Sequence, residues 1–197
     1  MRRLLAAIRG DPSTRRLASG TLLGVAVLTL AAAGGAAASL DGRDASGARP
    51  GGDHQLVLRV AHGPVTTSNS QYIDAAPSGS SPGDVRTYYL PLTRPGSTRE
   101  IGYLTGTLTT TATDRPDSGM ELRTADLVFV VGSAENQIVV GGVGAYARTA
   151  STLSKRTVTT RPVVGGSGAY AGARGWCVST HLADDTWTHV FHVTVMR

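Results

Sequence analysis

The chain has 197 residues and a formal net charge of +5 at pH 7. Residues 1–49 hold seven of the 19 basic and three of the 14 acidic residues, so the remainder, with 12 basic and 11 acidic residues, is nearly neutral. This balance argues against nucleic acid as a partner, because nucleic-acid-binding domains carry clustered basic residues. The single cysteine, Cys177, excludes an intrachain disulfide and a multi-thiolate metal site.

The N-terminal segment is organised like an export signal. Five arginines occur within residues 1–16, and residues 17–40 then carry no charge. A basic region followed by an apolar one is typical of a cleaved signal peptide, and this apolar run is also long enough for a retained anchor. We therefore predict an export signal or membrane anchor over residues 1–38. The rest of the protein would be secreted, or held outside the cytoplasmic membrane.

The remaining chain divides into a linker and one domain. Residues 39–53 are small, polar and glycine-rich, as in a flexible linker. Residues 54–197 are long enough for one domain with its own core. No helical pattern is evident there, because apolar residues alternate with polar ones at period two.

The alternation predicts eight strands separated by short turns and by one long polar loop, residues 63–83. Such a series favours an all-β fold, either a sandwich or a closed eight-stranded antiparallel β-barrel, and closure removes exposed edges. The expected strands are residues 56–62, 85–92, 101–113, 121–131, 137–142, 157–164, 175–182 and 186–196.

A glycine-rich stretch, "VVGGSGAYAGARGW", occupies residues 163–176, and a shorter echo, "VVGGVGAYAR", begins at Val139. The first loosely fits a dinucleotide-binding fingerprint, but that motif opens a helix inside a βαβ unit. Here a strand pattern follows. The glycines are therefore interpreted as positions of positive φ or close backbone approach between two strands. For the same reason, Ser167 is not interpreted as a nucleophile elbow.

The stretch "VVGGSGAYAGARG" resembles the GGTG-aromatic-x-x-ARG signature of plant dirigent proteins and the GGSG junction of allene oxide cyclases. The segments "GDVRTYYLPL", "REIGYLTGTLTT" and "LRTADLVFVVGSAENQIVVGG" resemble successive strands of the same superfamily, so the likeness covers roughly residues 83–197. The chain thus resembles a bacterial member of the dirigent and allene oxide cyclase-like β-barrel superfamily.

The resemblance implies an eight-stranded barrel with an internal apolar cavity, no cofactor, and a homo-oligomer, either a dimer or a trimer. It also implies the work of the small bacterial cyclases of this superfamily, which shape polyketide-type products by cycloaddition. Two departures bear on chemistry. The first predicted strand lacks the carboxylate expected of plant allene oxide cyclases, and Ala169 stands where dirigent proteins often carry a polar residue. Arg174 is the only charged residue of the dirigent signature that has a counterpart in this sequence.

Candidate substrate-binding residues follow from the strand patterns. One face of the final strand carries aromatic and imidazole rings that would line either the cavity or a subunit interface. Tyr88 and Tyr89 point to opposite faces, so only one of them can line the cavity. Arg123 shares a face with Glu121, and the mixed pattern favours an exposed pair. The candidates are Tyr88, Tyr103, Arg123, Arg174, Trp187, His189 and Phe191.

The spacing of His181, His189 and His192 does not predict a metal site, because no carboxylate or thiolate shares their pattern. We do not assign a catalytic residue. The leading hypothesis is a cofactor-free barrel cyclase or stereocontrol protein that folds a reactive, apolar, conjugated small molecule, for example in a [4+2] cyclisation. The alternatives are an exported, non-catalytic protein that binds a lipophilic small molecule, and a structural barrel that acts as an oligomer.

Overall fold

The computed structural model of the protein describes residues 52–76 and 79–196. The predicted signal or anchor and most of the predicted linker lie outside these residues. The described part forms ten strands and one short 3₁₀ helix. No helix in this part is long and apolar enough to cross a membrane. The elements are β1 (His54–His62), β2 (Ser70–Ile73), β3 (Val85–Thr93), β4 (Glu100–Thr113), β5 (Met120–Val131), β6 (Gln137–Val140), β7 (Val143–Ala147), β8 (Val158–Ser167), η1 (Gly168–Tyr170), β9 (Arg174–His181) and β10 (Trp187–Val195).

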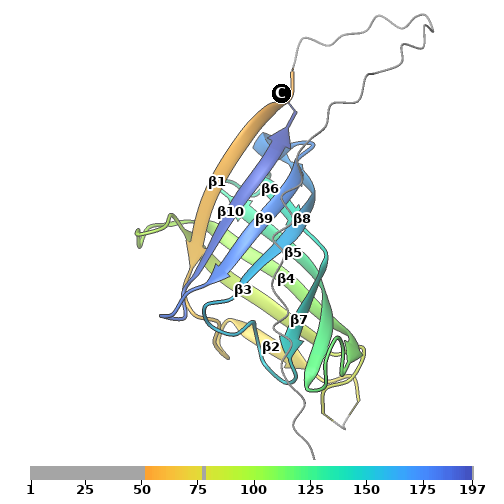
Figure 1. Ribbon diagram of the computed structural model, residues 1–197. Coiled ribbons are helices and arrows are strands. Elements are labelled where there is room, and N and C mark those ends of the chain that lie inside the picture. The colour runs from red at the N-terminus through yellow and green to blue at the C-terminus, as the bar shows by residue number, and fades with distance from the viewer. Residues whose placement is uncertain (1–51, 77–78, 197) are drawn as a thin grey trace, which may run out of the picture. The chain divides into compact units, whose positions relative to one another are not determined.

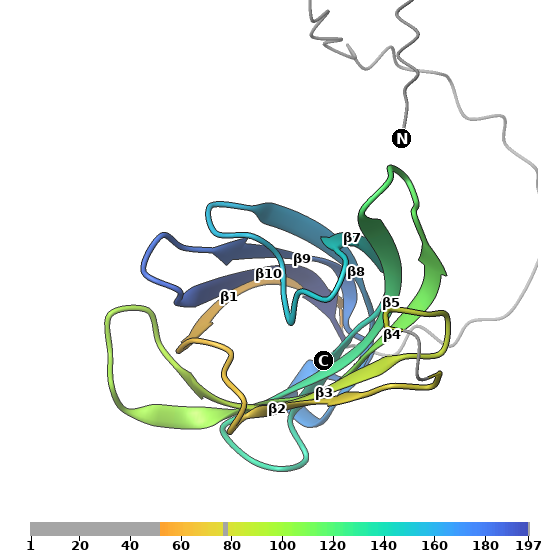
Figure 2. The ribbon, with the colours of Figure 1, turned by 90° about the horizontal axis from the view of Figure 1, so that it is seen from below.

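The strands form one antiparallel sheet that closes on itself (Figure 1). Its order is β1-β10-β9-β8-β6-β5-β4-β3, and pairing of Ala61 with Thr93 joins β1 to β3. Strands β6 and β7 pair with successive parts of β5 and so share one position in the ring, while β2 adds to the free edge of β3. The result is a closed, eight-stranded antiparallel barrel, seen end-on in Figure 2. The predicted fold class is therefore confirmed.

All eight predicted strands are present, with boundaries shifted by a few residues. The two additional strands, β2 and β7, are short and lack a regular apolar alternation. β2 lies inside the segment predicted as a long loop, and its four residues are partly or fully exposed. β7 carries a glycine and two alanines, and only Tyr146 is buried.

The strand pleat assigns every second side chain to the barrel interior. Along β10, Trp187, His189, Phe191, Val193 and Val195 are all buried, and the residues between them are partly exposed. The face that carries the rings is therefore the inward face, which settles the choice between cavity and subunit interface in favour of the interior. The other strands supply the rest of the core, including Leu92, Leu104, Phe129, Ile138 and Val140.

The glycine-rich stretch forms the corner between β8 and β9, with η1 inside it. Gly168 has a φ of +58°, and a Cβ there would lie 2.3 Å from Asn136 Oδ1 and 2.7 Å from the Glu135 carbonyl oxygen. At Gly166 a Cβ would lie 2.4 Å from the Tyr170 carbonyl oxygen and 2.7 Å from that of Gln137. These glycines thus serve positive φ and close backbone approach, as the sequence indicated.

We expect Gly168→Ala to lower the free energy of unfolding by about 1–3 kcal/mol, because alanine disfavours positive φ and its Cβ would meet backbone atoms. Gly165→Ala is the matched control in the same motif, since nothing lies within 4 Å of a Cβ at that position. Urea unfolding of both variants provides the measurement. Equal stability of the two variants would contradict the role assigned to Gly168.

Candidate functional site

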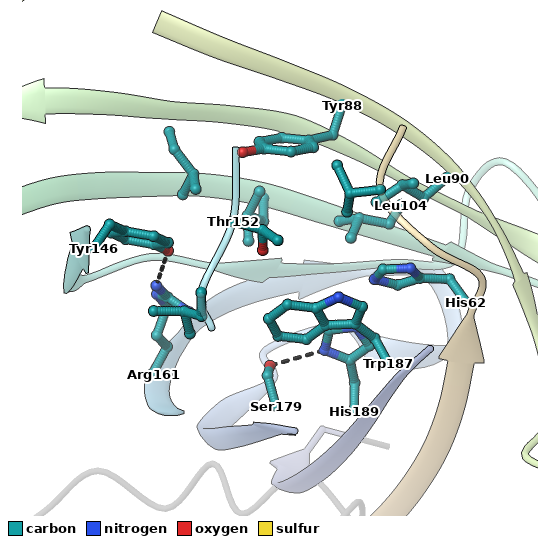
Figure 3. A pocket seen from close by; sticks show the side chains of 14 residues that line it. His62, Tyr88, Leu90, Leu104, Tyr146, Thr152, Arg161, Ser179, Trp187 and His189 are labelled. Carbon is teal, nitrogen blue, oxygen red and sulfur yellow. Dashed lines mark hydrogen bonds between the residues drawn. The ribbon is translucent and has the colours of Figure 1, made fainter. Parts of the chain in front are cut away.

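A cavity of about 50 Å³ lies in the barrel interior, beneath the loop that joins β7 to β8. One wall is apolar, the opposite wall carries flat aromatic and imidazole rings, and a tyrosine and an arginine lie at one side (Figure 3). The lining residues are His62, Val65, Tyr88, Leu90, Leu104, Leu108, Leu127, Tyr146, Thr152, Leu153, Arg161, Ser179, Trp187 and His189.

The ring wall is a set of parallel side chains from three adjacent strands. The Trp187 ring stacks on His181, with centroids 4.4 Å apart and planes 9° apart. His62 stacks on His189 at 5.1 Å, and Trp187 lies 6.1 Å from His189. Because β1, β10 and β9 are hydrogen-bonded neighbours, their inward side chains come into register here. The wall presents a flat surface suited to stacking on a conjugated molecule.

Two of these imidazoles are neutral at pH 7. Burial lowers the pKa of His62 to about 4, against the opposing effect of its hydrogen bond to the Gly63 carbonyl. Burial, with smaller contributions from His62 and Arg161, lowers the pKa of His189 well below its ordinary value. His189 Nδ1 lies 2.8 Å from the Ser179 hydroxyl, which fixes the orientation of the ring. No group of three or more His, Cys, Asp or Glu residues within 52–76 and 79–196 could hold a metal ion.

Tyr146 and Arg161 form the polar side of the cavity. Arg161 Nη2 donates a hydrogen bond to the Tyr146 hydroxyl, and Arg161 is only 5% exposed. A Cβ at position 144 would lie 2.5 Å from Arg161 Nη2, so Gly144 leaves the space that the guanidinium occupies. The shorter glycine-rich echo in the sequence therefore contributes to the site.

A buried ionic cluster lies on the far side of Tyr146. Arg123 Nε donates to Glu121 Oε1 over 2.5 Å, and Arg86 Nη2 lies 3.2 Å from the same oxygen. The Ser80 hydroxyl donates to the other carboxylate oxygen. The Arg123 guanidinium also lies 4.3 Å from the centroid of the Tyr146 ring. The cluster and the cavity thus share one aromatic side chain.

The β7–β8 loop, residues 148–157, covers the cavity. Figure 2 shows it reaching into the opening of the barrel. Interior side chains hold three of its carbonyls: Tyr88 Oη donates to Ser151 (2.6 Å), Arg123 Nη2 to Ala150 (2.5 Å) and His181 Nδ1 to Leu153 (2.8 Å). The Leu153 side chain is 8% exposed and lines the cavity. The loop is therefore attached to the same residues that form the site.

Within residues 52–76 and 79–196, four buried side-chain polar atoms have no hydrogen-bond partner: Arg123 Nη1, Arg161 Nε, Trp187 Nε1 and His189 Nε2. Three of them belong to residues that line the cavity. Buried polar groups are almost always paired in folded proteins, and each unpaired one costs about 1–3 kcal/mol. Unpaired buried polar groups are therefore concentrated in the residues that line this cavity.

The structure brings four of the seven candidate residues to this region. Tyr88, Trp187 and His189 line the cavity, and Arg123 holds the covering loop. Phe191 also faces inward, but it lies deeper in the core, where its ring packs edge-on against Phe129 with centroids 4.9 Å apart.

The remaining two candidates do not reach the cavity, which corrects the expectation for both. Tyr103 lies on the outer face of β4, where it stacks on Tyr89 with centroids 5.3 Å apart. Arg174 is exposed and pairs with Asp53 at the start of the described chain. The exposed Glu121–Arg123 pair favoured by the sequence is also wrong, since both side chains are fully buried. Glu121 also contacts Arg86 of β3 and Ser80 of the preceding loop, and the pattern within β5 does not predict these contacts.

Three lining residues, His62, Tyr146 and Arg161, were not predicted as site residues from the sequence. His62 ends a predicted strand, and its parity with Val60 is a signal that it faces inward. Arg161 shares parity with Val163 in the same way. Tyr146 gave no such signal, because its short strand was not predicted.

No protein-family model matches the chain, and no curated protein matches it by sequence. Several solved structures share the barrel. The structure named pyocyanin demethylase is 17% identical, with a TM-score of 0.52 over 70% of this chain and 99% of the other. The pterocarpan synthase dirigent protein GePTS1 is 17% identical, with a TM-score of 0.52 over 74% of this chain and 89% of the other.

A third similar structure is described as a nonspecific heme-binding cyclase that catalyses [4+2] cycloaddition during neoabyssomicin biosynthesis. It is 18% identical, with a TM-score of 0.52 over 74% of this chain and 68% of the other. At these identities the likeness establishes the fold. The barrel fold that the sequence resemblance implied is therefore confirmed.

We expect the stability of the protein to fall as the pH drops from 6.5 toward 4. His62 has an ordinary pKa of 6.5 and a pKa of about 4 in the fold, so in this window the unfolded chain binds the proton more readily. The loss from His62 is about 2 kcal/mol between pH 7 and pH 4.5. Urea unfolding across this range should show a shallower decline for His62→Phe. The exposed His54→Phe is the control, and identical acid dependence in all three proteins would contradict the assignment.

We expect Tyr88→Phe to loosen the β7–β8 loop, because it removes the hydrogen bond to the Ser151 carbonyl. A loss of about 1 kcal/mol would raise the population of the open loop about fivefold. Arg148, Lys155 and Arg156 are exposed trypsin sites in or beside this loop, so its cleavage rate reports opening. Tyr89→Phe, on the outer face, should leave the rate unchanged. Equal cleavage of both variants would show that Tyr88 does not hold the loop.

Proposed function

We propose that the barrel binds a reactive, apolar, conjugated small molecule in its interior and holds it in the geometry of a cyclisation, without a cofactor. The observation that carries this proposal is that three residues lining a largely apolar cavity, Arg161, Trp187 and His189, each have a buried polar atom without a hydrogen-bond partner among the described residues. Trp187 Nε1 can only donate, and it would suit a carbonyl oxygen of the ligand. His189 Nε2 would supply a second polar contact on the same wall.

The physical basis of catalysis would be confinement. The leucine wall and the parallel rings would restrict a flexible chain to few conformations, and holding reacting atoms in a near-attack geometry contributes up to about 7–11 kcal/mol. Exclusion of water by the covering loop would protect a reactive intermediate. The similar structure described as a [4+2] cyclase and the similar pterocarpan synthase dirigent protein support a role of this kind.

Binding requires the β7–β8 loop to move. The cavity of about 50 Å³ is smaller than the 300–1,000 Å³ typical of small-molecule sites. Leu153 lines the cavity from the loop, and the loop is attached by three hydrogen bonds that a modest input of binding energy can replace. In this proposal the structure represents the closed, ligand-free arrangement.

The alternative function is a carrier that binds a lipophilic molecule outside the cell and returns it unchanged. The export-type segment in residues 1–38 favours it, since a carrier works naturally outside the cytoplasm. Catalysis separates the two functions. The test compares the compound retained by the protein with the compound that accumulates in cells lacking the gene. If the protein is a cyclase, the retained compound should contain a new ring. If the protein is a carrier, the two compounds should be the same.

We expect a conjugated compound to co-purify with the full-length protein after exposure to an organic extract of the producing cells, as detected by native mass spectrometry. Trp187→Phe keeps the ring but removes the Nε1 donor, so retention should fall by up to about tenfold. Trp176→Phe is the matched control, because Trp176 is half exposed on the outer face of β9. Retention unaffected by Trp187→Phe, or no retained compound, would contradict binding in this cavity.

A further inference from the structure

The barrel interior holds more positive than negative charge. Arg86, Arg123 and Arg161 are 3%, 0% and 5% exposed, and only one carboxylate, that of Glu121, pairs with any of them in the part of the chain that the structure describes. Guanidinium groups stay protonated in proteins. The neutral His62 and His189 neither add to this charge nor offset it. The interior therefore carries an excess of two positive charges around the cavity.

Asp84 is the one other buried carboxylate near these arginines, and it does not remove the excess. Its oxygens accept hydrogen bonds from the Tyr72 hydroxyl, the Ala75 N–H, and both the N–H and hydroxyl of Ser81. These partners belong to the segment around β2, outside the cavity. If Asp84 is counted against Arg86, one positive charge still lacks a counterion.

Arg161 is the arginine that faces the cavity. Its one hydrogen bond goes to the neutral Tyr146 hydroxyl, and its Nε is buried without a partner. No carboxylate of the described residues lies within ion-pair distance of it, whereas Arg86 and Arg123 share Glu121. A buried charge without a counterion costs several kcal/mol. A side chain held in this state, at the edge of a cavity, has the properties of an anion site.

Arg123 adds to the positive field at the same place. Its guanidinium lies 4.3 Å from the Tyr146 ring centroid, and that of Arg161 lies 6.0 Å away, so two cations flank one aromatic ring. The Nη1 of Arg123 is also buried without a partner. Both arginines thus favour negative charge beside Tyr146.

We infer that the ligand is an organic acid whose carboxylate binds Arg161 beside Tyr146, with its apolar conjugated part between the leucine wall and the rings of Trp187 and His189. The inference rests on the proposed function and narrows its substrate class. A planar carboxylate matches the fork of a guanidinium and can accept two hydrogen bonds from it. Binding at one end would also fix which part of the chain faces the ring wall.

The test compares two probes of nearly equal shape, 2,4-hexadienoate and its methyl ester, by isothermal titration calorimetry on the full-length protein at pH 7. A purely apolar cavity would prefer the ester, because the acid is charged and better hydrated. We expect the acid to bind about 10- to 100-fold more tightly, as a charge-assisted hydrogen bond allows. Equal binding, or preference for the ester, would overturn the inference and leave the proposed function standing. Binding of neither probe would overturn both.

Variants locate the effect. Arg161→Gln should abolish the preference for the acid. Arg174 is an exposed arginine on the adjacent strand, so Arg174→Gln should keep the full preference. If Arg161→Gln does not fold, Arg161→Lys serves instead, since it keeps the positive charge but loses the planar fork that binds a carboxylate with two hydrogen bonds, and it should reduce the preference. A preference for the acid that survives the change at Arg161 would place the anion site elsewhere.

Discussion

Closure of the antiparallel sheet is the constraint on which the rest of the structure depends. Once β1 pairs with β3, every second side chain of each long strand faces one enclosed space. Residues far apart in the sequence, such as His62 and His189, then stack on one another. Closure also removes most exposed strand edges, so a domain with a single cysteine needs no disulfide to stay folded. The barrel can therefore carry polar groups inside that an open sheet would leave in water.

These polar groups divide the interior into two environments. Phe129, Phe191 and the aliphatic residues of β6 and β10 form a dry core of ordinary packing. Beyond the cavity, Arg86, Glu121 and Arg123 form a buried ionic cluster. Such a cluster is seldom the most stable solution for a core, because hydrophobic residues of similar volume often stabilise as well or better. Arg123 connects this cluster both to the Tyr146 ring and to the covering loop, so the cluster supports the proposed binding site.

Much of the fold could be predicted from the sequence, because period-two alternation and glycine-marked turns are local signals. The eight main strands and the aromatic face of β10 follow from them. The inward direction of Arg123 and Glu121 could not be predicted, because their strand carries polar residues on both faces and burial depends on partners from β3 and the loop before it. Tyr103 shows the same limit in reverse. An aromatic residue on a strand can lie on either face. Tyr103 is assigned to the outer face only because the next residue along the strand, Leu104, is buried.

A crystal structure of the full-length protein purified from its own cells, without added ligand, would test the binding role most directly. We expect an elongated molecule in the barrel interior that contacts Trp187 and Arg161, with Leu153 and the β7–β8 loop displaced from the mouth. A barrel whose loop stays closed, with only water or its own side chains in the cavity, would contradict a binding function. Function would then have to be sought on the outer surface of the barrel.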